Sequence, residues 1–109
     1  MGLFAVGAVV VVPFPFSDLS QSKLRPAVVL ADADRGDFIL CQITSNPYGD
    51  PLARVLSNAD FARGALRMTS YARPGKLFTA HRSLIQTEIG VLTPEAFREI
   101  REAVAALFK

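Results

Sequence analysis

The sequence predicts a mainly β protein, built as a small barrel or sandwich, with one helix at its C-terminus. Two observations indicate the sheet: the apolar runs are short and rich in Val, Ile and Phe, and turn-forming residues separate them at close spacing. A third observation indicates the helix, because beyond Thr93 apolar residues recur every three or four positions. The length predicts one domain, residues 1–109, with a buried core.

A β-hairpin is predicted near the centre of the chain. Two short apolar runs, residues 27–31 and 38–43, flank a polar loop that contains Gly36. If the loop is centred between residues 34 and 35, the numbers of paired residues sum to 69, and Arg25 faces Thr44 at the open end. Opposite residues of antiparallel strands point to the same side, so the guanidinium and the hydroxyl would meet there. A bulge at Gly36 would shift the register and separate them.

The N-terminal part supplies one strand and one polar loop. Residues 7–12 form a continuous apolar run, which predicts a strand buried on both faces. Because proline cannot donate a ladder hydrogen bond, we expect Pro13 and Pro15 to end the sheet pairing. The polar residues 17–23 then return the chain to the Arg25 end of the hairpin, where a loop can line a site.

The segment after the hairpin is dense in turn formers and predicts short elements. In chain order we expect a turn at 46–51, a strand at 52–56, a helical turn capped by Ser57 or Asn58 and ending near Gly64, a strand at 66–71, a turn at Pro74–Gly75, and a strand at 76–80.

The C-terminal helix has a clear start and an apolar face. Thr93 is the predicted N-cap, and Pro94 takes the first helical position. We expect the apolar face to pack on the core rather than on a partner. Its residues are Phe97, Ile100, Val104, Leu107 and Phe108.

Cysteine and histidine usage limits the chemistry. Cys41 is the single cysteine and His81 the single histidine, which excludes a Cys/His metal site and an internal disulfide. The apolar N-terminus is too short for a membrane span, and no Lys or Arg precedes Lys23. We therefore expect a cytoplasmic protein that does not bind a membrane.

Basic residues are concentrated in one part of the chain. The net charge is +2, but residues 54–82 hold six basic residues and one acidic residue, for a local charge of +5. This segment is a candidate surface for a polyanion. Scattered, solvated arginines explain the charge equally well.

Three stretches of the sequence resemble one known family. They are GAVVVVPFPFSDLSQSKLRPAVVL at residues 7–30, CQITS at residues 41–45, and YARPGKLFTAHRSLIQTEIGVLTPE at residues 71–95. Their order, with an Arg-Pro pair that opens a strand and a Thr-Ser pair that closes one, resembles the PemK/MazF toxins of bacterial toxin–antitoxin systems. The resemblance implies an SH3-like small β-barrel with a C-terminal helix, the CcdB/MazF-like toxin fold. That family usually has an acidic residue where this chain has Ala8.

The resemblance also implies an activity and partners. Proteins of this family are homodimers that cut single-stranded RNA, use neither a metal nor another cofactor, and are blocked by a cognate antitoxin peptide in the RNA groove. By motif, their catalytic residues fall on Arg25 and Thr44, the pair that the hairpin register brings together. The polar residues expected to line the RNA groove are Ser17, Gln21, Lys23 and Ser45.

The residue types fit this chemistry. Arg25 offers a fork of donors suited to phosphate oxygens, and Thr44 can donate a hydrogen bond to the same phosphate. Attack by the 2′-hydroxyl would leave a 2′,3′-cyclic phosphate and a 5′-hydroxyl. Further candidates are two tyrosines that can stack on bases and two cations that can hold phosphates: Tyr48, Tyr71, Arg73 and Lys76.

Other interpretations stay open at this point. Considered alone, Arg25 is an ordinary strand-end arginine and Thr44 an ordinary strand residue. A toxin that resembles CcdB, which poisons DNA gyrase through its C-terminal helix, is a second class of function. An inactive relative that only binds RNA or an antitoxin is a third.

Overall fold

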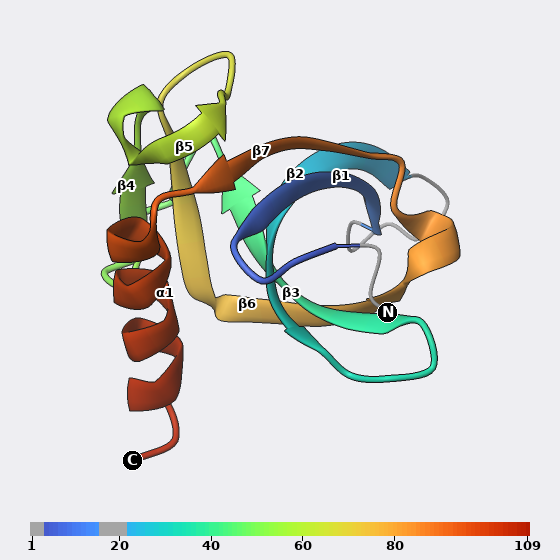
Figure 1. Cartoon of the computed structure of the whole chain (residues 1–109). Helices are drawn as coiled ribbons and strands as arrows, with labels where there is room; N and C mark the ends of the chain where they lie inside the picture. Colours follow the sequence, from blue (N-terminus) through green and yellow to red (C-terminus); the bar gives the residue numbers. More distant parts are fainter. Residues whose placement is uncertain (1–3, 16–21) are drawn as a thin grey trace.

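The computed structural model describes residues 4–15 and 22–109, in which one antiparallel sheet of seven strands curls into a half-barrel beside a helix (Figure 1). The strand order is β4-β6-β3-β2-β1-β7-β5. The elements are β1 (Ala8–Pro15), β2 (Ser22–Asp32), β3 (Asp37–Thr44), β4 (Arg54–Leu56), η1 (Asn58–Asp60), β5 (Phe61–Gly64), β6 (Ser70–His81), η2 (Arg82–Leu84), β7 (Thr87–Leu92) and α1 (Pro94–Ala106). The predicted mainly β fold with a C-terminal helix is confirmed.

Apolar residues cover both faces of the sheet. On β1, Val10 and Val12 belong to a core cluster on the face turned away from α1, and Phe4 packs on Phe38 at its edge. Val9 belongs to a second cluster, which includes Ile100 of α1. The continuous apolar run at residues 7–12 therefore serves two cores, which confirms the predicted strand buried on both faces.

The central hairpin keeps the predicted register at its open end. Ala27 pairs with Gln42, so the residue numbers sum to 69 there. A bulge at Leu30 moves the register by one residue toward the loop, where Asp32 pairs with Phe38. The shift thus occurs on β2 rather than at Gly36, and the predicted register holds from Val29–Leu40 to Ala27–Gln42, where the ladder ends.

Two predictions made from prolines are wrong. Pro13 and Pro15 remain in β1, where Pro13 pairs with Leu24 of β2. The β1–β7 ladder ends at Val11, and the Val11 carbonyl faces the β7 side, where it accepts from the Gln86 N–H. Residues two apart on a strand direct their backbone groups to the same side, so the nitrogens of Pro13 and Pro15 face the β7 side, as the Val11 carbonyl does. Because β7 no longer pairs with β1 there, no ladder hydrogen bond is lost.

Pro74 and Gly75 do not form a turn between two strands. They lie inside β6, which pairs with β3 on both sides of a register shift and changes direction there (Figure 1). Because Pro74 cannot join the ladder but is buried, the strand bends instead of reversing. Residues 66–69, expected in a strand, form a loop.

The predicted helix caps are confirmed. Ser57 begins η1, although that turn ends at Asp60 and the residues up to Gly64 form β5. The Thr93 hydroxyl oxygen accepts a hydrogen bond of 3.2 Å from the Ala96 N–H at the start of α1.

The helix packs on the core through part of its apolar face. Ile100 is fully buried, and Phe97 and Val104 pack against the same cluster. Leu107 and Phe108 remain exposed at the C-terminal end. Within the described ranges, no helix is both long enough and apolar enough to cross a membrane.

Candidate active site

The two predicted catalytic residues lie just beyond the end of the β2–β3 ladder. The last pair of this ladder is Ala27–Gln42, so Arg25 and Thr44 each lie two residues beyond it on their own strand. Thr44 pairs with Tyr71 of β6. Since directly opposite residues share a face, the side chains of Thr44 and Tyr71 are neighbours on the sheet.

A cavity of about 750 Å³ opens where the β2–β3 ladder ends. Three of the predicted site residues, Arg25, Thr44 and Ser45, line it. The other residues that line it are Val11, Leu24, Pro26, Ile43, Ala65, Leu66, Arg67, Met68, Ser70 and Ile89. Its walls are mainly apolar, and its described lining contains Arg25 and Arg67 but no Asp or Glu.

Local hydrogen bonds fix the Thr44 hydroxyl. It donates to the Asn46 carbonyl oxygen at 3.1 Å and accepts from the Asn46 N–H at 3.2 Å. These bonds are those of a Ser/Thr turn, which starts the loop after β3. A substrate phosphate would have to draw the hydroxyl proton away from the Asn46 carbonyl.

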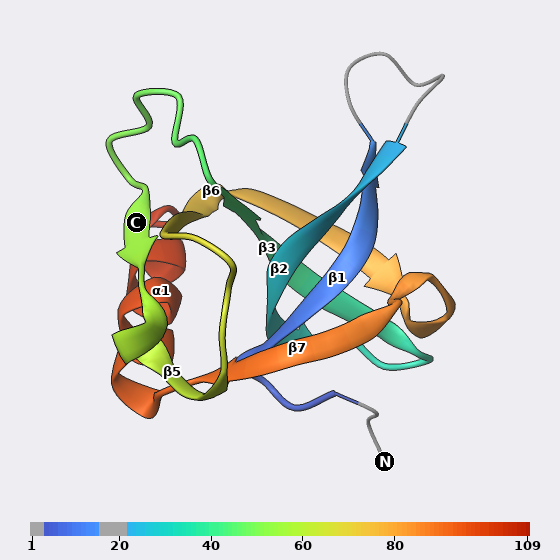
Figure 2. The same ribbon diagram turned by 90° about the horizontal axis from the view of Figure 1, so that it is seen from above.

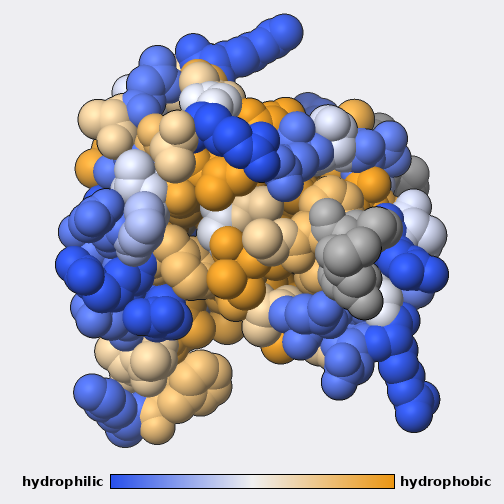
Figure 3. Space-filling view, in the orientation of Figure 1, coloured by the Kyte–Doolittle hydropathy of each residue, from blue (hydrophilic) through white to orange (hydrophobic). Residues whose placement is uncertain are grey.

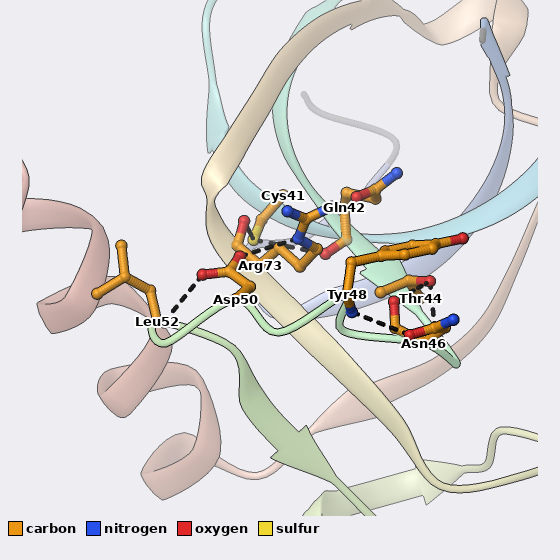
Figure 4. A network of polar contacts seen from close by, with 8 residues as sticks. All are labelled: Cys41, Gln42, Thr44, Asn46, Tyr48, Asp50, Leu52 and Arg73. Atoms are coloured by element: carbon orange, nitrogen blue, oxygen red, sulfur yellow. Dashed lines mark hydrogen bonds and ion pairs between the residues drawn. The ribbon is translucent and has the colours of Figure 1, made fainter.

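Arg73 anchors the loop that follows Thr44 (Figure 4). Its Nε donates to Asp50 Oδ2 at 2.9 Å, and its guanidinium carbon lies 5.8 Å from the centre of the Tyr48 ring. The hydrogen bond from Arg73, together with one from the Leu52 backbone, lowers the pKa of Asp50. Tyr48 itself is 69% exposed, so its ring is available for stacking.

The remaining predicted residues lie outside the cavity lining. Lys23 is exposed at the start of β2, and Lys76 is exposed at the bend of β6. Ser17 and Gln21 lie outside the described residues.

Two polar residues near the cavity, Gln42 and Arg67, were not predicted from the sequence as site residues. Gln42, in the last pair of the β2–β3 ladder, has a buried Oε1 atom with no hydrogen-bond partner in the described structure. Its signal in the sequence is an amide in the otherwise apolar run FILCQIT. Arg67 lines the cavity from the loop between β5 and β6, and only its place in the basic segment hinted at a role.

Cys41 is a structural residue beside this site. Its Sγ donates to the Arg73 carbonyl oxygen at 3.2 Å, and burial raises the pKa of the thiol to about 12. His81 lies at the other end of the hairpin, where it pairs with Asp37 in the β3–β6 ladder and its Nδ1 contacts the Ser83 hydroxyl. Across residues 4–15 and 22–109, no three His, Cys, Asp or Glu side chains are grouped as a metal ion would require.

The curled SH3-like sheet and its terminal helix form a MazF-like fold, with a cavity lined by two arginines at the end of the central hairpin. The family described as "PemK-like, MazF-like toxin of type II toxin-antitoxin system" matches residues 5–108, and the chain belongs to this family.

Solved structures show the same fold at low sequence identity. The Deinococcus radiodurans MazE–MazF complex (Form-II) is 20% identical, covers 99% of this chain and 97% of the matched chain, and has a TM-score of 0.74. A mycobacterial endoribonuclease in complex with its cognate antitoxin is 17% identical, covers 99% and 95%, and has a TM-score of 0.72. The Mycobacterium tuberculosis toxin MazF-mt6 is 17% identical, covers 91% and 95%, and has a TM-score of 0.67. No protein with a curated description matches the chain.

Proposed function

We propose that this toxin is an endoribonuclease that cuts single-stranded RNA without a metal ion and leaves a 2′,3′-cyclic phosphate and a 5′-hydroxyl. The main support is that Arg25 and Thr44, from two neighbouring strands, line one cavity whose described lining holds two arginines and no carboxylate. The family match makes an RNA-cutting toxin the favoured class over a CcdB-like protein that acts on gyrase.

In the proposed reaction, the 2′-oxygen attacks the neighbouring phosphorus. A bond forms between this oxygen and phosphorus, and the bond from phosphorus to the 5′-oxygen breaks. Negative charge builds on the non-bridging oxygens, where the Arg25 guanidinium can donate two parallel hydrogen bonds. Thr44 donates a further hydrogen bond to the same phosphate.

The proton transfers are assigned to water. A guanidinium group keeps its proton in proteins and is a poor base, so Arg25 is assigned only the stabilisation of negative charge. His81 lies at the closed end of the hairpin and is bonded to Ser83, so it is not the acid or base of this proposal.

Several exposed residues around the cavity are assigned to the RNA. Tyr48 and Tyr71 would stack on unpaired bases, and Lys23 and Lys76 would contact phosphates. Arg73 would act mainly by holding the Tyr48 loop, because its Nε is bonded to Asp50. Ser45 lines the cavity, and Ser17 and Gln21 are assigned to the groove by the family resemblance alone.

We also propose that the toxin acts in the cytoplasm as a homodimer and is blocked by a cognate antitoxin. The antitoxin is supported by the two matched complexes, each of which pairs a similar fold with an antitoxin. A protein contact is supported by the apolar surface in the middle of one face of the molecule (Figure 3). Leu24, Val55 and Met68 are each at least half exposed.

The test is cleavage of a mixture of single-stranded RNAs by purified protein in excess EDTA, followed by analysis of the new ends. We expect cutting that survives EDTA and leaves cyclic phosphates. Failure to cut, or cutting only after magnesium is added, would contradict the proposal. Arg25→Ala should fold, as judged by circular dichroism and an unfolding midpoint, but should not cut.

A further inference from the structure

We propose that Arg67 is a second phosphate-binding residue, and that the cavity between Arg67 and Arg25 holds the nucleotide beside the cut site. This inference rests on the proposed RNA cleavage and adds a residue to it. It starts from the basic segment at residues 54–82, whose local charge of +5 left two interpretations open.

The structure divides the arginines of that segment into two kinds. Three of them are neutralised by carboxylates: Arg54 by Asp60 and Glu99, Arg63 by Glu88, and Arg73 by Asp50. Arg67 and Arg82 differ, because both are exposed and their side chains make neither an ion pair nor a hydrogen bond in the described part of the chain. Of these two, Arg67 lines the cavity and Arg82 does not, so the charge of Arg67 is available to an anion that enters it.

Arg67 is one of the residues that line the cavity. Arg67 lies on the loop that joins β5 to β6, drawn in yellow in Figure 2, which faces strands β1, β2 and β7. Arg25 lines the same cavity from β2. These two arginines are the basic residues of the described lining. Pro26, Ile43 and Met68 form apolar walls of this cavity.

The occupant that fits these features is one nucleotide of an RNA strand. A volume of about 750 Å³ lies within the range of about 300–1,000 Å³ typical of small-ligand sites. In a single strand every nucleotide carries a phosphate, so a strand with its scissile phosphate at Arg25 brings a flanking phosphate within one nucleotide of it. The apolar walls then contact the base, and Arg67 binds the flanking phosphate.

The test measures how RNA affinity depends on salt. Wild type, Arg67→Gln, Arg67→Lys and the control Arg98→Gln would be titrated into a fluorescent single-stranded RNA that is 2′-O-methylated throughout and cannot be cut. Arg98 is exposed on α1 and does not line the cavity, so its loss gives the same change in net charge. Each phosphate contact to a single strand contributes about 0.7 to the slope of log K against log salt. We expect Arg67→Gln to lower the slope by about 0.7, whereas Arg67→Lys and Arg98→Gln keep the wild-type value.

The possible failures can be told apart. Suppose that wild type binds the RNA, but the salt slope of Arg67→Gln equals that of wild type or falls no more than the slope of Arg98→Gln. The assignment of Arg67 is then overturned, while RNA binding stands. If Arg67→Gln keeps its RNA slope but no longer binds an antitoxin peptide, the assignment is also overturned, and the cavity belongs to a protein partner. If wild type does not bind RNA at all, the proposed function itself fails.

Discussion

Replacing Thr44 by valine separates its proposed role in cleavage from its structural role. Valine keeps the β-branched shape that suits β3 but removes the hydroxyl, and with it the hydrogen bonds of 3.1 and 3.2 Å to the Asn46 backbone. Each bond contributes about 0.5–1.5 kcal/mol, and both are exposed, so water replaces part of what is lost. We expect Thr44→Val to lower the free energy of unfolding by about 1–2 kcal/mol.

That loss of stability cannot account for a large loss of activity. A domain with at least about 5 kcal/mol of stability keeps about 3 kcal/mol in the variant, so less than about 1% of it is unfolded at 25 °C. Loss of a hydrogen bond to the transition state, in contrast, reduces the rate by about 100-fold or more. The assay is single-turnover cleavage at saturating protein, with urea unfolding of the same samples and Thr44→Ser as the control that retains a hydroxyl. Wild-type cleavage by Thr44→Val, or equal losses in Thr44→Val and Thr44→Ser, would refute the assignment.

Three further predictions concern the residues around the site. Gln42→Met should keep or raise the urea midpoint, with a free energy of unfolding higher by up to about 1–3 kcal/mol, because it removes a buried acceptor that has no partner. A clearly lower free energy of unfolding would mean that the amide is hydrogen-bonded. Cys41, with its pKa raised by burial to about 12, should react with thiol reagents at neutral pH only in denaturant; fast native labelling would contradict this. Because Arg73 lowers the pKa of Asp50 in the folded state, this carboxylate stabilises the protein above its unfolded pKa of about 3.9 and loses that effect as the pH falls through the folded pKa. Asp50→Asn should therefore be less stable than wild type at neutral pH, and urea midpoints should converge in acid; a gap independent of pH would contradict the ion pair.

Features set by neighbours in the sequence could be predicted. The Ser57 and Thr93 caps depend on a few consecutive residues, and both begin the elements expected of them. The register at Ala27 and Gln42 follows from matching apolar runs on either side of a polar loop. These features are local, so their physical causes are visible in the sequence itself.

Features set by tertiary pairing could not be predicted. Pro13 and Pro15 stay in a strand because β7 no longer pairs with that part of β1, which is a property of the sheet and not of the prolines. Pro74 bends β6 instead of reversing it because β3 continues to pair on both sides. A local rule that proline ends pairing lacks this information.

In the candidate site, too, some residues could be predicted from the local sequence and others depend on the tertiary structure. Arg25 and Thr44 lie two residues beyond a predictable hairpin pair, so the sequence could place both at the end of the hairpin where the cavity opens. Arg67 reaches the cavity from a loop more than twenty residues further along the chain, and nothing in its local sequence distinguishes it from the paired arginines. Only the ion pairs of the folded structure separate an available charge from a neutralised one.

The most direct test of cleavage through the 2′-hydroxyl uses an RNA whose cut site has been mapped. A single 2′-deoxynucleotide on the 5′ side of the scissile phosphate removes the proposed attacking oxygen and changes nothing else. In excess EDTA, the wild-type protein should bind both RNAs with similar affinity, cut the all-ribose RNA, and leave the substituted one intact. Cutting of the deoxy-substituted RNA at the same phosphodiester would mean that water is the nucleophile, and the mechanism proposed for Arg25 and Thr44 would be wrong.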